Sequence, residues 1–199
     1  MLASLLTIRS WIPLIDRCDM DVRRIPAVFF ILASLFALGG NEAAFAQQEA
    51  ACAASEYHEL DFWIGDWVVL NGEDGPKSAD VLIEPILGGC GLHEIWTGAQ
   101  GPRGNGRGLA SYERGTGDWR YTWISAGGGS SIMTGELIND GEEMLFVFED
   151  SGRDGRPRLN RWSLIDLPDG RVRELALASL DGGQTWETSY DLYWSEAER

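Results

Sequence analysis

The chain has 199 residues and a formal net charge of -15 at pH 7, with 16 Lys and Arg against 31 Asp and Glu. Its length suffices for one domain with a buried core, and 44% hydrophobic with 24% charged residues is ordinary for a globular protein. Contact with phosphate depends on clustered Lys and Arg, so the acidic balance and scattered basic residues argue against nucleic acid and anionic lipid headgroups as partners.

The first part of the chain has the features of an export signal. An Arg pair at 23–24 precedes an apolar run at 25–38, and Ala-Phe-Ala at 44–46 has the small-x-small form of a signal-peptidase site. The apolar run is shorter than the about 20 residues that a membrane-spanning helix needs. We therefore predict a signal region at 1–46, cleaved near Ala46, a periplasmic or secreted bacterial protein, and no stable membrane insertion after cleavage. A retained anchor is the alternative, and Met20 is an alternative start.

The remaining chain divides into an N-terminal segment with a short helix at 47–64 and a barrel domain at 65–199. With Cys18 in the signal region, Cys52 and Cys90 remain as an even pair in an oxidising compartment. We predict a disulfide between them. The alternative, a lipid anchor on Cys52, is disfavoured because the residues before it lack the apolar side chain that such an anchor requires.

The stretch at 60–70 joins the predicted helix to the first strand. From Tyr57 to Ile64 apolar residues recur three to four positions apart, as on one face of a helix, and beyond Gly65 they follow a strand pattern. Gly65 is expected to be the left-handed residue that ends the helix. Trp63 and Trp67 are then expected to seal one end of the barrel.

Short strands separated by turn signals fill the rest of the chain. The predicted strands are 68–70, 80–87, 92–98, 108–114, 118–126, 130–139, 142–150, 158–167, 171–180 and 185–194. Turn residues such as Asp140-Gly141 and Asp169-Gly170 suit tight hairpins. No helical pattern lies between strands. We therefore predict an all-β fold, an antiparallel up-and-down barrel of about ten strands with the short helix plugging one end.

Four blocks, in this order, resemble a bacterial family of secreted domains of unknown function. They are Phe-Trp-Ile-Gly-Asp-Trp at 62–67, Gly-Gly-Cys-Gly-Leu-His-Glu-Ile-Trp at 88–96, Trp-Arg-Tyr-Thr-Trp at 119–123 and Ser-Leu-Asp-Gly-Gly-Gln-Thr-Trp at 179–186. The resemblance implies a lipocalin-like, or calycin, barrel and no particular reaction. In lipocalins the Trp of the first strand packs against a basic residue of the last strand. This chain departs from that pattern, since 190–194 carries no Lys or Arg.

The block at 179–186 also fits the Asp-box of sialidase-like propellers. A propeller needs several blades, whereas this motif occurs once. We therefore interpret the block as a hairpin turn in which the side chain of Asp181 caps backbone amides, with Trp186 in a structural role.

Alternation along the strands selects the candidate ligand-binding residues, because every second side chain of a barrel strand faces the interior. A charge on an inward face is costly unless it is paired, which singles out Glu94 and Arg161. The predicted ligand-binding residues are Glu94, Trp96, Tyr121, Trp123, Phe146 and Arg161. The alternative is that the aromatic side chains only fill the barrel and that the two charges form a structural ion pair.

Metal and cofactor sites are not expected. His58 and His93 are the only histidines, and the predicted disulfide removes two cysteines from any zinc site. No histidine follows His93, which disfavours a haem ligand near the C-terminus. No Gly-x-Ser-x-Gly motif for a nucleophile is present.

Three functions remain open from the sequence. The favoured one is an exported barrel that binds a small hydrophobic or aromatic molecule, as a monomer or small homo-oligomer. The second is a small barrel enzyme of the isomerase or cyclase type, in which Glu94 is the acid or base and Tyr121 a donor. The third is a carbohydrate or cell-wall binding module that stacks sugars on exposed Trp.

Overall fold

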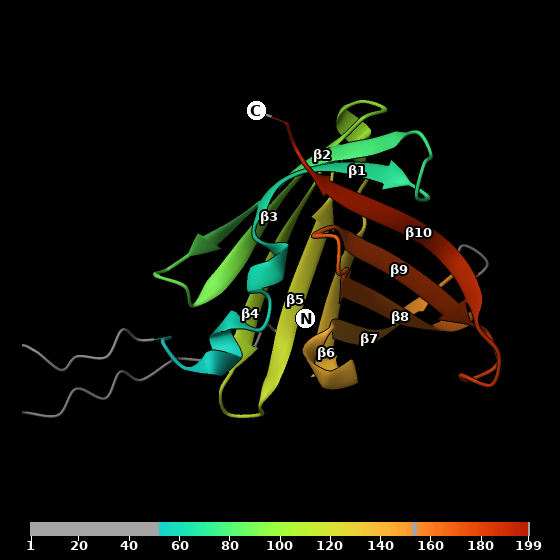
Figure 1. Cartoon of the computed structure of the whole chain (residues 1–199). Helices are drawn as coiled ribbons and strands as arrows, with labels where there is room; N and C mark the ends of the chain where they lie inside the picture. Colours follow the sequence, from blue (N-terminus) through green and yellow to red (C-terminus); the bar gives the residue numbers. More distant parts are fainter. Residues whose placement is uncertain (1–51, 153–154, 199) are drawn as a thin grey trace, which may run out of the picture. The chain divides into compact units, whose positions relative to one another are not determined.

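A computed structural model describes residues 52–152 and 155–198 (Figure 1). The predicted signal region lies outside the described residues. Among the residues described, no helix combines the length and the hydropathy that crossing a membrane would take.

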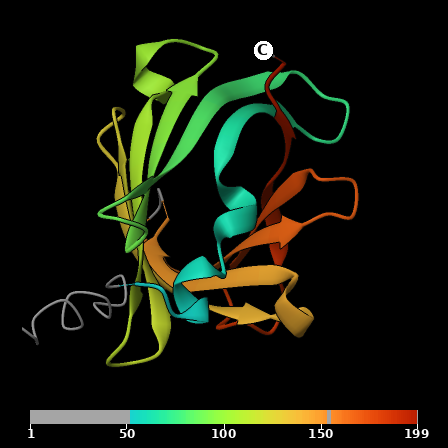
Figure 2. The same cartoon turned by 60° about the vertical axis from the view of Figure 1, so that its left-hand side comes forward.

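The described chain forms a closed barrel of ten antiparallel strands (Figures 1 and 2). Each strand pairs with its neighbour in sequence, and β1 pairs with β10, so no strand edge is left unpaired. The strands are β1 (Gly65–Asn71), β2 (Lys77–Ile86), β3 (Gly91–Gly98), β4 (Gly106–Glu113), β5 (Asp118–Ser125), β6 (Ser130–Ile138), β7 (Glu143–Ser151), β8 (Pro157–Asp166), β9 (Val172–Ser179) and β10 (Glu187–Glu196). The predicted all-β, ten-stranded antiparallel barrel is confirmed.

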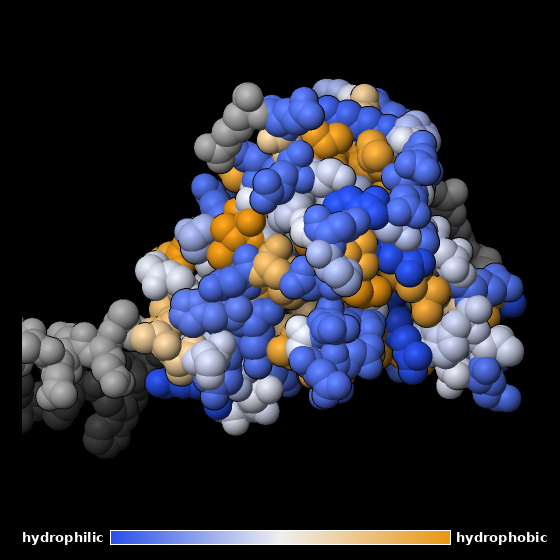
Figure 3. Space-filling model, viewed as in Figure 1, coloured by the Kyte–Doolittle hydropathy of each residue, from blue (hydrophilic) through white to orange (hydrophobic). Residues whose placement is uncertain are grey.

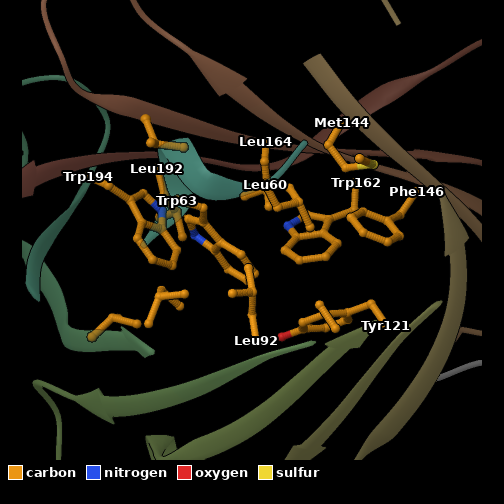
Figure 4. Packing of buried hydrophobic residues seen from close by; sticks show 14 of the residues in the cluster. Leu60, Trp63, Leu92, Tyr121, Met144, Phe146, Trp162, Leu164, Leu192 and Trp194 are labelled. Carbon is orange, nitrogen blue, oxygen red and sulfur yellow. The ribbon is translucent and has the colours of Figure 1, made fainter. Parts of the chain in front are cut away.

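The segment before β1 contains two short 3-10 turns, η1 (Ser55–His58) and η2 (Asp61–Trp63), in place of one continuous helix. Leu60 and Trp63 from this segment are fully buried in the barrel core (Figure 4). Gly65 does not end a helix in a left-handed conformation as predicted; it opens β1 with φ 157°. The reason is that η2 already ends at Trp63 and Ile64 is extended, so no helix reaches Gly65. A Cβ on Gly65 would lie 3.2 Å from the Trp67 indole, which leaves little room for a side chain there.

Indole packing joins the first and last strands. Trp67 donates its Nε1 hydrogen to the Trp63 carbonyl over 3.0 Å, and its ring meets the Trp194 ring of β10 edge-on at 6.4 Å. Trp63 lies 5.7 Å from the same Trp194 ring. An aromatic residue therefore occupies the last strand beside Trp67, where lipocalins have a basic one.

The turn between β9 and β10 has the predicted structure. The Oδ1 atom of Asp181 accepts hydrogen bonds from the backbone amides of Gln184 and Thr185, both at 2.9 Å, and Oδ2 accepts one from the Thr185 hydroxyl at 2.6 Å. These bonds favour the charged carboxylate and lower the pKa of Asp181. Trp186 donates to the Gly183 carbonyl at 3.1 Å, which completes the turn.

Cys52 and Cys90 form a disulfide, with Cα atoms 5.1 Å apart and 38 positions between them in sequence. The bridge ties the segment before η1 to the turn between β2 and β3. Because it closes a long loop, it restricts the unfolded chain and stabilises the barrel.

Replacing both bridged cysteines with serine is expected to lower the free energy of unfolding by about 3–4 kcal/mol, the loop-closure value for a loop of this length. Urea unfolding followed by Trp fluorescence measures the difference. Reduction of the wild-type protein with dithiothreitol is the control, because it opens the same loop without a substitution. Equal unfolding midpoints for the double variant and the wild type would contradict the expectation.

Candidate functional site

The barrel holds an internal cavity of about 670 Å³. Half-buried aromatic side chains from three strands form much of its wall, namely Trp96 of β3, Trp123 of β5 and Phe148 of β7. Exposed residues of β10, Ser189 and Tyr190, lie at its mouth. The cavity thus leads from solvent into the aromatic interior of the barrel.

Glu94 lies on β3 at the inner part of this cavity and is only 4% exposed. Its Oε2 atom accepts a short hydrogen bond from the Tyr121 hydroxyl of β5. Burial raises the pKa of Glu94 to about 8, the Tyr121 hydrogen bond opposes that rise, and the nearby charge of Glu174 adds to it. The carboxyl group therefore changes its charge close to neutral pH.

Glu174 of β9 is a second buried carboxyl group in the same cavity, at 6% exposure. Its Oε1 accepts a hydrogen bond from Trp162 Nε1 at 2.8 Å and its Oε2 one from Trp194 Nε1 at 3.0 Å. The Tyr190 hydroxyl is a third hydrogen-bond partner. Burial raises the pKa of Glu174, while these three hydrogen bonds favour its charged form.

Sequence reasoning missed Glu174. The signal that identifies it is its alternation with Val172 and Ala176, both buried, which places the glutamate on the inner face of β9. The alternate positions hold Arg173 and then the apolar Leu175 and Leu177. Because apolar residues lie on both faces of the strand, the sequence does not show the alternation that would have identified Glu174 as an inward-facing charge.

The two buried carboxyl groups have no basic partner among residues 52–152 and 155–198. The ion pairs there all join other residues. Arg158, which also lines the cavity, pairs with Asp150 through two contacts of 2.8 and 2.6 Å. The interior of the cavity is therefore acidic.

Two glycines of β4 make room for these side chains. A Cβ on Gly106 would lie 2.0 Å from the Trp123 ring. A Cβ on Gly108 would lie 2.3 Å from the Tyr121 hydroxyl oxygen and 2.6 Å from Oε2 of Glu94. Any larger residue at 108 would displace the Glu94–Tyr121 pair.

Five predicted ligand-binding residues border the cavity: Glu94, Trp96, Tyr121, Trp123 and Arg161. Phe146 does not line it. This side chain faces inward as predicted, but it is fully buried and stacks on Trp162 with ring centroids 4.9 Å apart. Phe146 therefore belongs to the packed core seen in Figure 4.

Arg161 borders the cavity, but the prediction that its side chain faces the barrel interior is wrong. Arg161 is exposed, and its guanidinium carbon lies 4.2 Å from the centre of the Trp186 ring. The buried residues of β8 on either side of it are Asn160 and Trp162, so the inward phase of the strand differs by one residue from the predicted phase. The alternative, a structural ion pair between Arg161 and Glu94, is not found among residues 52–152 and 155–198, where Arg161 contacts the Trp186 ring.

The histidines form separate surface contacts, His58 with Asp61 at 2.9 Å and His93 with Glu84 at 3.2 Å. In the part of the chain that the structure describes, no group of three or more His, Cys, Asp or Glu side chains is arranged to hold a metal ion.

No protein-family model and no curated protein matches the chain. The resemblance to the secreted lipocalin-like family remains a prediction. We therefore infer the function from the residues of the cavity.

Gly108→Ala is expected to lower the free energy of unfolding by about 1–3 kcal/mol, because the added methyl group overpacks the space between Glu94 and Tyr121. Thermal unfolding followed by circular dichroism measures it. Gly129→Ala is the matched control, since a Cβ there meets no atom within 4 Å; we expect it to change stability by less than about 1 kcal/mol. Similar losses in both variants would contradict the close approach at Gly108.

Glu94→Gln is expected to change how stability depends on pH. The pKa of Glu94 is raised from 4.5 to about 8 on folding, so its contribution to stability is fully present below about pH 4.5 and is lost as the pH rises towards 8. The Glu94→Gln variant has no group that titrates at this position, so it does not lose stability in this way as the pH rises. Its free energy of unfolding relative to the wild type should therefore rise with pH in that window, by at most about 1.4 kcal/mol per unit.

Urea unfolding at several pH values measures this difference. Glu136→Gln is the control, because Glu136 is exposed on β6 and its substitution removes the same charge from the outer surface. A difference between the Glu94→Gln variant and the wild type that stays constant with pH would contradict the raised pKa.

Proposed function

We propose that the protein is an exported barrel that binds a small, mainly apolar aromatic molecule in its internal cavity. The observation that carries this proposal is the open cavity of about 670 Å³ with an aromatic wall. This volume lies in the range of about 300–1,000 Å³ that is typical of small-molecule sites. Small barrels are more often filled by their own side chains.

The division of the barrel interior into a filled part and an open part supports the proposal. Trp63, Phe146 and Met144 are fully buried in the filled part. Trp96 and Trp123, by contrast, are only half-buried, and they meet edge-on at 6.3 Å beside the cavity. Aromatic surface that is left open inside a cavity gains free energy when a flat apolar ligand covers it.

Export and the lipocalin-like relationship are parts of the same proposal. The disulfide between Cys52 and Cys90 supports an oxidising compartment such as the periplasm. The antiparallel up-and-down topology and the buried Trp63 and Trp67 before and within β1 support a calycin-type barrel, in which the N-terminal segment covers one end.

The two other functions have less support. The eight Trp side chains of the described residues are all buried or half-buried, so none offers the exposed platform that sugar stacking needs. Figure 3 shows one face on which apolar residues lie in separate patches among polar ones. Acid or base chemistry by Glu94 requires a side chain shielded from solvent, and Glu94 meets that condition, but nothing in the cavity identifies a reaction.

The neutral fluorescent probe N-phenyl-1-naphthylamine is expected to bind with a stoichiometry of one. Trp123→Ala should weaken this binding about tenfold, equivalent to about 1.4 kcal/mol, because it removes part of the aromatic wall. Fluorescence titration measures both. Trp186→Ala is the control, since the Trp186 side chain does not line the cavity, although it contacts Arg161, which does. Absence of saturable binding to the wild type, or equal loss in the two variants, would contradict the proposal.

A further inference from the structure

We propose that the cavity selects molecules with a positively charged ammonium group. This group would be held between Glu94 and Glu174, with the apolar body of the molecule against Trp96 and Trp123. The inference rests on the proposed function, because it assigns the charge of the ligand to the same cavity.

Glu94 has one oxygen atom left to bind a ligand. Its Oε2 accepts the hydrogen bond from Tyr121, but Oε1 has no hydrogen-bond partner among the described residues. The side chain is 4% exposed and lines the cavity, so the small surface that it keeps is the surface that a ligand would meet. Among the described residues, Trp63 Nε1 is the one fully buried side-chain nitrogen or oxygen atom without a partner. Oε1 of Glu94 therefore keeps accessible surface, through which it can accept a hydrogen bond from a donor on the ligand.

Glu174 supplies a charge that the protein does not neutralise. Its hydrogen-bond partners are the indole groups of Trp162 and Trp194 and the hydroxyl of Tyr190, all of them uncharged donors. They satisfy the carboxylate oxygens but bring no positive charge. A cationic ligand would provide the opposite charge in a site of low dielectric constant, where the interaction is stronger than in water.

The charged and titratable groups around Glu94 come from five strands. They are Tyr121 of β5, Asp150 of β7, Arg158 and Arg161 of β8, Glu174 of β9 and Tyr190 of β10. Arg158 is paired with Asp150, and Arg161 is exposed and contacts the Trp186 ring. The charged group that is buried together with Glu94 is therefore the carboxyl group of Glu174.

The aromatic wall suits the same kind of ligand. Ammonium groups are attracted to the faces of Trp and Tyr rings, by about 0.5–2 kcal/mol depending on desolvation. Trp96, Trp123 and Tyr121 offer such rings within the cavity that contains the carboxyl groups. The net charge of -15 also favours the approach of cations over anions.

Binding of a cation should be linked to the loss of a proton from Glu94. An ammonium group favours the ionised form of Glu94. A protonated Glu94 carboxyl group therefore releases its proton to solvent as the ligand enters. Because the pKa of Glu94 is about 8, its ionised fraction rises with pH up to that value. The affinity for a cation should therefore rise with pH, by about ten- to thirtyfold between pH 6.5 and 8.5.

The test uses three probes with the same indole body: tryptamine, which is a cation, tryptophol, which is neutral, and indole-3-acetate, which is an anion. An alkylammonium pKa of about 10 keeps tryptamine charged at pH 8.5. Isothermal titration calorimetry of the full chain at pH 6.5 and 8.5 gives the three affinities. Repeating the pH 6.5 titration in buffers with different protonation enthalpies gives the number of protons released.

At pH 8.5 we expect tryptamine to bind at least tenfold more tightly than tryptophol, and indole-3-acetate to bind most weakly. Glu94→Gln should remove the pH dependence and the proton release and should weaken tryptamine at least tenfold at pH 8.5, with little effect on tryptophol. Glu136→Gln removes an exposed charge from the outer surface and should leave the tryptamine affinity, its pH dependence and the proton release unchanged. This control separates the site from the general field of the acidic protein.

The outcomes distinguish this inference from the proposed function. Binding of all three probes with equal affinity, or a preference for the anion, would overturn the choice of a cation and leave an aromatic binding site. Binding of none of them would overturn the aromatic site as well. If Glu94→Gln and Glu136→Gln weakened tryptamine equally, the preference would come from net charge, and the role of Glu94 would be refuted.

Discussion

Closure of the barrel by the pairing of β1 with β10 is the constraint on which the rest of this structure depends. It fixes which side chains face the interior, since each strand presents every second residue to one side. Indole groups reinforce the closure, because Trp67 of β1 packs against Trp194 of β10 and both lie close to Trp63. Without this joint, β9 would not face β3, and Glu174 and Glu94 would not share a cavity.

The size of the inward-facing side chains decides which part of the barrel interior is packed and which part is open to a ligand. Large aromatic residues such as Trp63 and Phe146 fill one part completely. Glycines at 106 and 108 of β4 remove side-chain volume in another part, where Trp123 and the Glu94–Tyr121 pair occupy the vacated space. A small barrel therefore keeps an open cavity without loss of its packed core.

Burying two carboxyl groups without a basic partner costs stability, and the protein offsets only part of that cost with neutral donors. Such groups are common where a site must hold charge for a ligand, and less common in a core whose only role is packing. The disulfide between Cys52 and Cys90 compensates by restricting the unfolded chain. The disulfide thus adds to the free energy of unfolding that the buried carboxyl groups reduce.

The sequence by itself determined the strands, the turn built on Asp181, the cysteine pair and the inward positions of Glu94, Trp96, Tyr121 and Trp123, because these depend on local turn chemistry and a period of two. Only the tertiary structure decided three further points. The phase of β8 turns Arg161 outward, depth within the barrel places Phe146 in the core, and closure brings Glu174 to Glu94. Strand phase, depth and closure depend on contacts between distant segments, which no local pattern records.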